Sequence, residues 1–203
     1  MLRKQILPAI LMTLVLCVLT GLAYPAVVTG LAQVIFPRQA NGSLVSVNGR
    51  VVGSELIGQS FSQPYYFHSR PSAAGAGYDA TASAGTNKGP TDRKLADTLI
   101  AQSVDSAIAQ DHVTKGAIPS DMVTRSGSGL DPHISPANAF VQVARVAQAR
   151  HVDSVSVRRL VEAHVEGRQF GFFGEPRVNV LMLNIALDSA FKLAPVPAQT
   201  SSR

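Results

Sequence analysis

A run of 31 residues without a single charge, Ile6–Phe36, constrains the fold of this 203-residue chain more than any other feature. As an α-helix the run would be roughly 46 Å long, whereas the hydrocarbon core of a bilayer is about 30 Å thick. A cleaved signal peptide is the alternative, but its apolar region has only about 7–15 residues. The run therefore predicts one transmembrane helix with an interfacial extension, with its best span over residues 7–28.

The charges that flank this run predict its orientation. Arg3 and Lys4 lie directly before it, and the first positive charge on the far side is Arg38. Segments rich in Lys and Arg next to a membrane span tend to stay in the cytoplasm. We therefore expect a single-pass protein of the bacterial inner membrane, with a cytoplasmic N-terminus and a periplasmic domain.

Small residues recur along one face of the predicted span. They are four residues apart, a spacing that lets a second membrane helix approach closely: Thr13, Cys17, Gly21, Pro25 and Thr29. This pattern predicts a packing surface for a partner helix. A lone lipid anchor is the alternative, because such residues are common in membrane helices. The span holds no ionisable residue that could serve an ion pathway.

Composition excludes several classes of function for the remainder of the chain. Arg3 and Lys4 account for two of the five net positive charges, which leaves +3 on the rest. A nucleic-acid partner is not expected, because the chain has no Lys/Arg run and no basic stripe. Cys17 is the sole cysteine, so neither an intramolecular disulfide nor a cysteine zinc site can form. No metal-binding pair of histidines or of Glu and His is present.

The pattern after Pro37 changes to short strands, turns and amphipathic helices. Asn48-Gly49 between two apolar runs predicts a β-hairpin over 43–52 with a type I′ turn. Residues 65–68 and 178–182 have the composition of strands, while residues 71–90 lack any period and predict a long loop. Residues 118–124 predict a turn region. The predicted helices are 91–111 capped by Thr91, a helix from Ser135-Pro136 to Arg150, one from Ser154 to Val165, and one over 183–191.

These elements together predict an α+β fold, in which one N-terminal transmembrane helix precedes a single soluble domain of helices and short strands. The expected boundaries are a cytoplasmic tail over 1–5, the membrane helix and its extension over 6–36, the periplasmic domain over 37–193, and a disordered tail over 194–203.

Chemistry-bearing motifs are sparse. Ser126-Gly127-Ser128-Gly129 could present successive N–H groups to an anion, or be a plain turn. Residues 85–90 lack the spacing of a phosphate loop. Asp131 and His133 invite comparison with hydrolases, but no Gly-x-Ser-x-Gly elbow occurs. From the residues alone, three classes remain: an accessory subunit of a membrane complex, a periplasmic binding module and an enzyme.

An ordered set of sequence blocks resembles one family, the C subunit of the Kdp-type potassium-transporting ATPase. The blocks are 21–25, 36–44, 53–59, 66–72, 87–90, 123–135 and 176–181, and the likeness extends from about Gly21 to Asp188. The most specific block is Val-Thr-Arg-Ser-Gly-Ser-Gly-Leu-Asp-Pro-His-Ile-Ser over 123–135. Each block alone is a weak signal, whereas the ordered set is specific.

The resemblance implies an essential accessory subunit of a high-affinity, ATP-driven potassium importer. Its partners would be a channel-like KdpA-type subunit, a P-type ATPase subunit of KdpB type and a small KdpF-type subunit, besides membrane lipid. The chain lacks the Asp-Lys-Thr-Gly-Thr motif of P-type pumps and is expected to be non-catalytic by itself. The family's C subunit is described as a catalytic chaperone that raises the ATP affinity of the ATPase subunit. The resemblance thus implies ATP, shared with that subunit, and makes Ser126, Gly127, Ser128, Gly129 and Leu130 nucleotide-contact candidates.

The predicted orientation conflicts with that description, because a periplasmic domain would not meet cytoplasmic ATP. The alternative is a periplasmic cap that shapes potassium entry to the channel-like subunit without contacting ATP. In that case the carboxylates of Glu55, Asp79 and Asp131 are possible cation-attracting groups. A second alternative is a membrane-anchored periplasmic binding module or hydrolase. No catalytic residue, metal ligand or cofactor of the chain itself is predicted.

Overall fold

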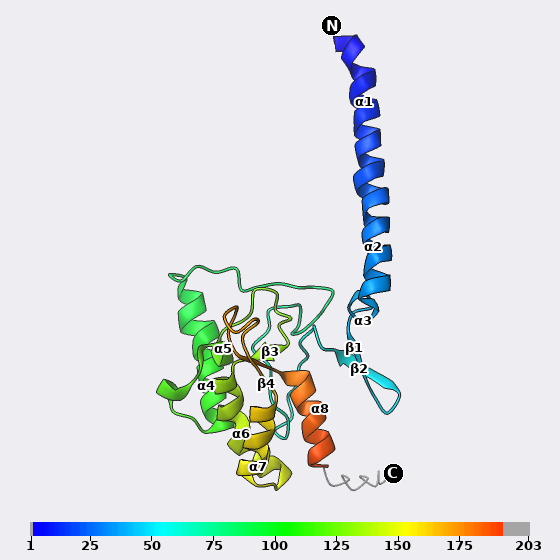
Figure 1. Cartoon of the computed structure of the whole chain (residues 1–203). Coiled ribbons are helices and arrows are strands. Elements are labelled where there is room, and N and C mark those ends of the chain that lie inside the picture. Colours follow the sequence, from blue (N-terminus) through cyan, green and yellow to red (C-terminus); the bar gives the residue numbers. More distant parts are fainter. Residues whose placement is uncertain (1, 193–203) are drawn as a thin grey trace, which may run out of the picture. The chain divides into compact units, whose positions relative to one another are not determined.

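The computed structural model describes residues 2–192 (Figure 1) and divides into two compact units, with the boundary between Ser54 and Glu55. A long apolar helix and a short hairpin form the first unit, and a mixture of helices and short strands forms the second. The predicted α+β fold with one long apolar N-terminal helix is therefore confirmed. The predicted disordered tail 194–203 lies outside the described residues.

One continuous helical rod makes up most of the first unit. It consists of α1 (Leu2–Val18), a π-helical turn (Leu19–Ala23) and α2 (Tyr24–Ile35). Pro25 explains the wide turn, because proline has no N–H to donate and its ring collides with the preceding turn of a regular α-helix. Within residues 2–192, this is the one helix long and apolar enough to cross a bilayer, and none of the span is buried against the rest of the chain.

A β-hairpin follows the short helix α3 (Pro37–Ala40). Strands β1 (Leu44–Val47) and β2 (Arg50–Ser54) pair antiparallel, with Val47 opposite Arg50. The backbone φ angles of Asn48 and Gly49 are 51° and 77°, which are the two positive values that a type I′ turn requires. The predicted hairpin is confirmed.

The second unit is built around a three-stranded antiparallel sheet in the order β3-β5-β4. Its strands are β3 (His133–Ile134), β4 (Val165–Glu166) and β5 (Arg177–Asn179). Helices α6 (Pro136–Arg150) and α8 (Val180–Ala190) pack against β5, and α7 (Ser154–Ala163) packs against these two helices. Their apolar faces meet in one core, made of Phe67, Ile134, Ala139, Val143, Val146, Ala147, Val157, Val161, Val178, Val180, Leu183 and Leu187.

The segment Pro64–His68 lies against this core without joining the sheet, and its Phe67 side chain is buried there. It begins with a turn, in which the Tyr66 N–H donates to the Gln63 carbonyl at 3.1 Å. Side-chain amides take the place of a neighbouring strand. Asn184 accepts from the Phe67 N–H at 2.9 Å and donates to the Phe67 carbonyl at 2.9 Å, and Gln142 does the same for His68 at 2.7 and 3.1 Å. The predicted strand 65–68 is therefore wrong, because the segment begins in a turn and its hydrogen bonds go to helices α6 and α8 instead of to a strand.

Two buried arginines of α6 complete the attachment of this segment. Arg145 donates to the carbonyls of Pro64 and Tyr66, and Arg150 donates to the carbonyl of Tyr65. The guanidinium of Arg145 also pairs with the buried carboxylate of Asp111 at 2.8 Å, and it donates to the Gln142 amide oxygen. Five consecutive carbonyls of the chain are thus satisfied by side chains of two helices.

The remaining elements differ from the sequence-based predictions mainly at their ends. The helix predicted over 91–111 is a π-helical turn (Leu95–Ile100) leading into α4 (Ala101–Asp111), and the carboxylate of Asp92, not Thr91, accepts from the N–H groups of Lys94 and Leu95. Asp153, not Ser154, caps α7, which ends at Ala163. The turn region 118–124 contains α5 (Ser120–Val123) and follows a short 3₁₀ turn (Lys115–Ala117).

Two further predictions concern the chain near α6 and α8. The predicted strand 178–182 is shorter, because the Asn179 side chain accepts from the Met182 N–H and starts α8 at Val180. The helix predicted from Ser135-Pro136 to Arg150 agrees with α6 at both ends, with the Ser135 hydroxyl accepting from the Asn138 N–H.

We expect Gln142→Leu to lower the free energy of unfolding by about 2–4 kcal/mol, although it places an apolar side chain in the core. The substitution leaves the N–H and carbonyl of His68 without partners. Urea unfolding of the full-length chain in detergent, followed by circular dichroism, measures the effect. Gln148 is exposed on the same helix, so Gln148→Leu should change stability by less than about 0.5 kcal/mol. Equal stabilities of the two variants would contradict this role for Gln142.

Candidate functional site

The glycine-rich segment 126–130 lies against the long loop 71–90. The Ser83 hydroxyl and the Ala84 N–H both donate to the carbonyl of Ser128, at 2.9 and 3.0 Å. The Ser72 hydroxyl donates to the carbonyl of Gly129 at 2.6 Å, and the Gly58 N–H donates to the carbonyl of Leu130 at 2.8 Å. Two carbonyls of the segment, Ser128 and Gly129, therefore hold the loop, and the next carbonyl, Leu130, binds the chain at Gly58.

Two glycines allow the backbones to come this close. A Cβ atom on Gly129, whose φ is +69°, would lie 2.6 Å from the carbonyl oxygen of Ala84 and 2.7 Å from the nitrogen of Ala74. A Cβ atom on Gly85 would lie 2.7 Å from the carbonyl oxygen of Gly127. Gly127 differs, because no heavy atom lies within 4 Å of the position that its Cβ would occupy. The segment thus has one closely packed end and one open glycine.

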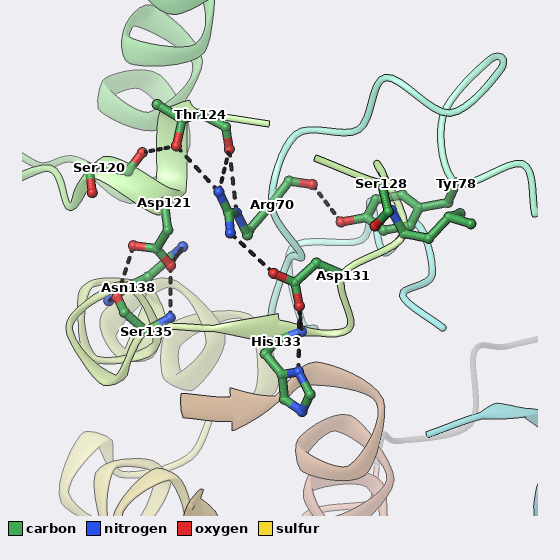
Figure 2. Close-up of polar contacts among 11 residues, drawn as sticks. Arg70, Tyr78, Ser120, Asp121, Thr124, Ser128, Asp131, His133, Ser135 and Asn138 are labelled. Carbon is green, nitrogen blue, oxygen red and sulfur yellow. Dashed lines mark hydrogen bonds and ion pairs between the residues drawn. The ribbon is translucent and has the colours of Figure 1, made fainter. Parts of the chain in front are cut away.

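A polar network lies where this segment meets β3 (Figure 2). Arg70 forms an ion pair with Asp131 at 3.1 Å and donates to the Thr124 carbonyl, while the Tyr78 hydroxyl donates to the Arg70 carbonyl at 2.6 Å. Burial acts to raise the pKa of Asp131, but hydrogen bonds from His133 and the charge of Arg70 outweigh it, so this pKa lies below the usual value. Asp131 is therefore an ionised, charge-compensated group near neutral pH.

A second carboxylate lies near this network and binds the start of α6 (Figure 2). Asp121 of α5 accepts from the N–H and hydroxyl of Ser135, at 2.7 and 2.8 Å, and from the Asn138 amide at 3.0 Å. A negative charge at a helix N-terminus is favourable because the first N–H groups of the helix point toward it. Sequence reasoning did not single out Asp121, because it lies 14 positions before Ser135 and so outside the reach of local capping patterns.

A cleft of about 320 Å³ runs along α4, and polar side chains dominate its lining. Asp111 and Gln142 of the Arg145 network lie in its wall, as do Gln102, Ser106, His68 and Arg125. A smaller hollow of about 180 Å³ shares Leu99, Ser103 and Arg125 with it. Burial, with a further contribution from the charge of Arg145, lowers the pKa of His68, so this imidazole is neutral at pH 7. Sequence reasoning missed this cleft, because its walls come from segments far apart in the chain.

The three carboxylates predicted to attract cations lie in different surroundings. Asp131 is paired with Arg70 and His133, as described above. Asp79 is exposed, and its carboxylate accepts from the N–H and hydroxyl of Thr81. Glu55 begins the second unit, and its carbonyl accepts from the Asn179 amide.

Within residues 2–192 the structure contains no group of three or more metal-ligating side chains. A cation-attracting role for these residues stays a prediction.

The small residues of the long helix are all exposed on its surface. The Thr13 hydroxyl donates to the Ala9 carbonyl at 2.9 Å, which satisfies the only polar group of that side chain within the helix itself. No atom lies within 4 Å of a Cβ built on Gly21. Thr13, Cys17, Gly21, Pro25 and Thr29 are thus available for a neighbouring helix, and the predicted packing surface stays a prediction.

Comparison with known proteins decides the family. Residues 6–189 match the family described as "K+-transporting ATPase, c chain", abbreviated KdpC. The chain belongs to the KdpC family. It is 59% identical over 193 residues to a potassium-transporting ATPase KdpC subunit of Gemmatimonas aurantiaca, which covers 95% of this chain and 96% of the relative. The KdpC subunit of Koribacter versatilis is 55% identical over 186 residues, which cover 92% of this chain and 95% of the relative. That of Myxococcus xanthus is 54% identical over 192 residues, which cover 94% of this chain and 90% of the relative.

The KdpC match confirms the family that the sequence blocks had indicated. It makes the chain a component of a potassium-transporting ATPase complex with other subunits, in agreement with an accessory role in potassium transport. The match spans both units, so the long helix and the second unit belong to one family pattern.

Gly129→Ala should lower the free energy of unfolding by at least about 2 kcal/mol, because the new methyl group meets backbone atoms at a positive φ. Limited proteolysis and thermal unfolding of the full-length chain would report this loss, with the first cleavages expected in the loop 71–90. Gly127→Ala is the matched control two residues away, where the methyl group has open space and stability should change by less than about 0.5 kcal/mol. A Gly129→Ala variant as stable as Gly127→Ala would refute the close packing described here.

Proposed function

We propose that this chain is the accessory subunit of an ATP-driven potassium importer, and that its second unit lies outside the cytoplasm. There it stabilises the complex and borders the potassium entrance of the channel-like subunit, without contacting ATP. The observation that carries the proposal is the long apolar helix with Arg3 and Lys4 in its first turn, because positive charges at this end favour a cytoplasmic N-terminus.

The glycine-rich segment supports this proposal. Its carbonyls at Ser128, Gly129 and Leu130 are bound by residues of the second unit, and a Cβ atom on Gly129 would collide with backbone atoms of two loop residues. The Ser128 hydroxyl accepts from the Leu130 N–H. These contacts give the segment a structural task, which is to hold the loop 71–90, and that task needs no nucleotide.

Nucleotide contact by Ser126–Leu130 is the second candidate function. The open position at Gly127 favours it, because a phosphate group could approach the backbone there without meeting a side chain. In this candidate function the chain would raise the ATP affinity of the ATPase subunit, as the resemblance implies. The two candidate functions place the second unit on opposite sides of the membrane and are therefore separable by experiment.

A hydrolase is a weaker candidate. The His133 ring lies 3.4 Å from the Asp131 carboxylate, which resembles two members of a catalytic triad. In the described part of the chain, however, no serine or cysteine side chain forms a hydrogen bond with that ring. The arrangement lacks the contact between nucleophile and base that hydrolysis requires.

Thiol labelling should place the second unit outside the cytoplasm. In a Cys17→Ser background, Ala80→Cys in the exposed loop should react with a membrane-impermeant maleimide in intact spheroplasts. Gln5→Cys near the N-terminus should react only after the membrane is permeabilised. The reverse pattern, with Ala80→Cys protected until permeabilisation, would overturn the proposed topology and favour the nucleotide contact.

A charge at Gly127 tests the nucleotide contact directly. In the reconstituted complex, a carboxylate beside bound triphosphate would raise the ATP concentration for half-maximal activity by about tenfold, which corresponds to ~1.4 kcal/mol of repulsion. We expect Gly127→Asp to change this concentration by less than about twofold. Gly127→Ala controls for the loss of the glycine itself. A tenfold rise confined to Gly127→Asp would establish nucleotide contact.

A further inference from the structure

Three phenylalanines lie exposed on the connection between β4 and β5. Phe170, Phe172 and Phe173 are 87%, 65% and 57% exposed, and we call them the phenylalanine tip. At roughly 200 Å² for each side chain, these fractions leave about 400 Å² of aromatic surface in water. A patch of this size matches the largest apolar patches of typical monomers, which are often sites of interaction.

The tip is held in shape by its own backbone. Gln169 and Phe173 exchange two hydrogen bonds of 2.9 Å, and the Gly171 N–H donates to the Arg168 carbonyl at 3.1 Å. The rings of Phe172 and Phe173 are in contact, with centroids 4.2 Å apart. Because these contacts already hold the hairpin in one shape in the free chain, binding a partner would cost little conformational entropy.

Phe170 has an unusual backbone for an aromatic residue. Its φ is +53°, a conformation that bulky side chains rarely adopt. Such a conformation is strained and tends to persist at sites where it serves a function. Phe170 is also the most exposed of the three phenylalanines, so the strained backbone and the exposed ring occur at the same residue.

The charges at the base of the tip favour a protein partner over a lipid surface. Arg168 pairs with Glu175, and Arg177 pairs with Glu166 at 2.9 Å, so the base of the hairpin carries no net charge. Apolar segments that bind membrane surfaces usually add unpaired Lys and Arg, which attract anionic lipids. An aromatic centre with arginines and neutralised charges at its rim is typical of protein interfaces instead.

We propose that the phenylalanine tip docks into an apolar pocket on another subunit of the potassium-transport complex, on the side of the membrane where the second unit lies. This inference rests on the proposed function, because it requires that the chain assembles with membrane-embedded partners. The tip is then the anchor of the interface, and the paired arginines and glutamates form its polar rim.

Photo-crosslinking in the assembled complex tests the inference. A benzophenone-bearing phenylalanine analogue at position 170 or 172 should form an adduct with another subunit, which mass spectrometry identifies. The same analogue at position 155, which is half-exposed on α7, should give no such adduct. Adducts with lipid alone, adducts with a second copy of this chain, or no adduct at all would each overturn the docking proposal.

A truncation of the tip supplies an independent measurement. The combined substitutions Phe170→Ser, Phe172→Ser and Phe173→Ser should reduce the chain retained on tagged complex after a detergent wash by at least about tenfold. The thermal unfolding midpoint of the isolated chain should stay within about 4 °C of the unaltered chain, because the three rings are exposed. Val155→Ser is the matched surface control and should retain the complex fully. Full retention by the triple variant would overturn the proposal.

These experiments also separate this inference from the proposed function. If the unaltered chain copurifies with the complex but the tip neither crosslinks to a subunit nor affects retention, only the docking proposal fails. If the unaltered chain does not copurify with the complex, the proposed function fails first.

Discussion

The fold of the second unit depends on the hydrogen bonds that attach the segment Pro64–His68 to helices α6 and α8. Carbonyl groups at five successive positions accept hydrogen bonds from side chains, three of them from Arg145 and Arg150 and two from the amides of Asn184 and Gln142. Each buried backbone N–H or carbonyl without a partner lowers the stability of the fold by about as much as one lost hydrogen bond. These four side chains therefore hold an irregular segment against the core, and they place the Phe67 side chain within it.

The same attached segment connects the core to the candidate site. The segment continues directly to Arg70, which reaches Asp131 and Thr124, and then to the loop that Ser128 and Gly129 hold. Gln142 binds this segment and Asp111 pairs with Arg145, and both side chains also line the cleft along α4. A continuous series of hydrogen bonds and ion pairs thus links α6 to the glycine-rich segment.

Local signals in the sequence predicted the elements that local interactions determine. The Asn48-Gly49 turn and the Ser135-Pro136 helix start depend on residues within four positions of one another, and both were predicted correctly. The caps at Asp92 and Asp153 were each missed by one residue, because a neighbouring Thr or Ser offers a similar oxygen. The strand expected over 65–68 failed for a different reason, since its partners lie 74 or more positions away in sequence. In the candidate site, Asp131 and His133 stood out as chemistry-bearing residues, but Arg70, 61 positions from Asp131, could not be recognised as its partner.

The π-helical turn at Leu19–Ala23 has a geometric consequence for the stripe of small residues. On a regular α-helix with 3.6 residues per turn, a step of four residues overshoots a full turn by about 40°, so a stripe from Thr13 to Thr29 would wind about 160° around the helix. The wider turn takes up roughly one additional residue, which returns about 100° of that rotation. Pro25 thereby brings the two halves of the stripe back toward a common face, and a straight neighbouring helix could follow it along its full length.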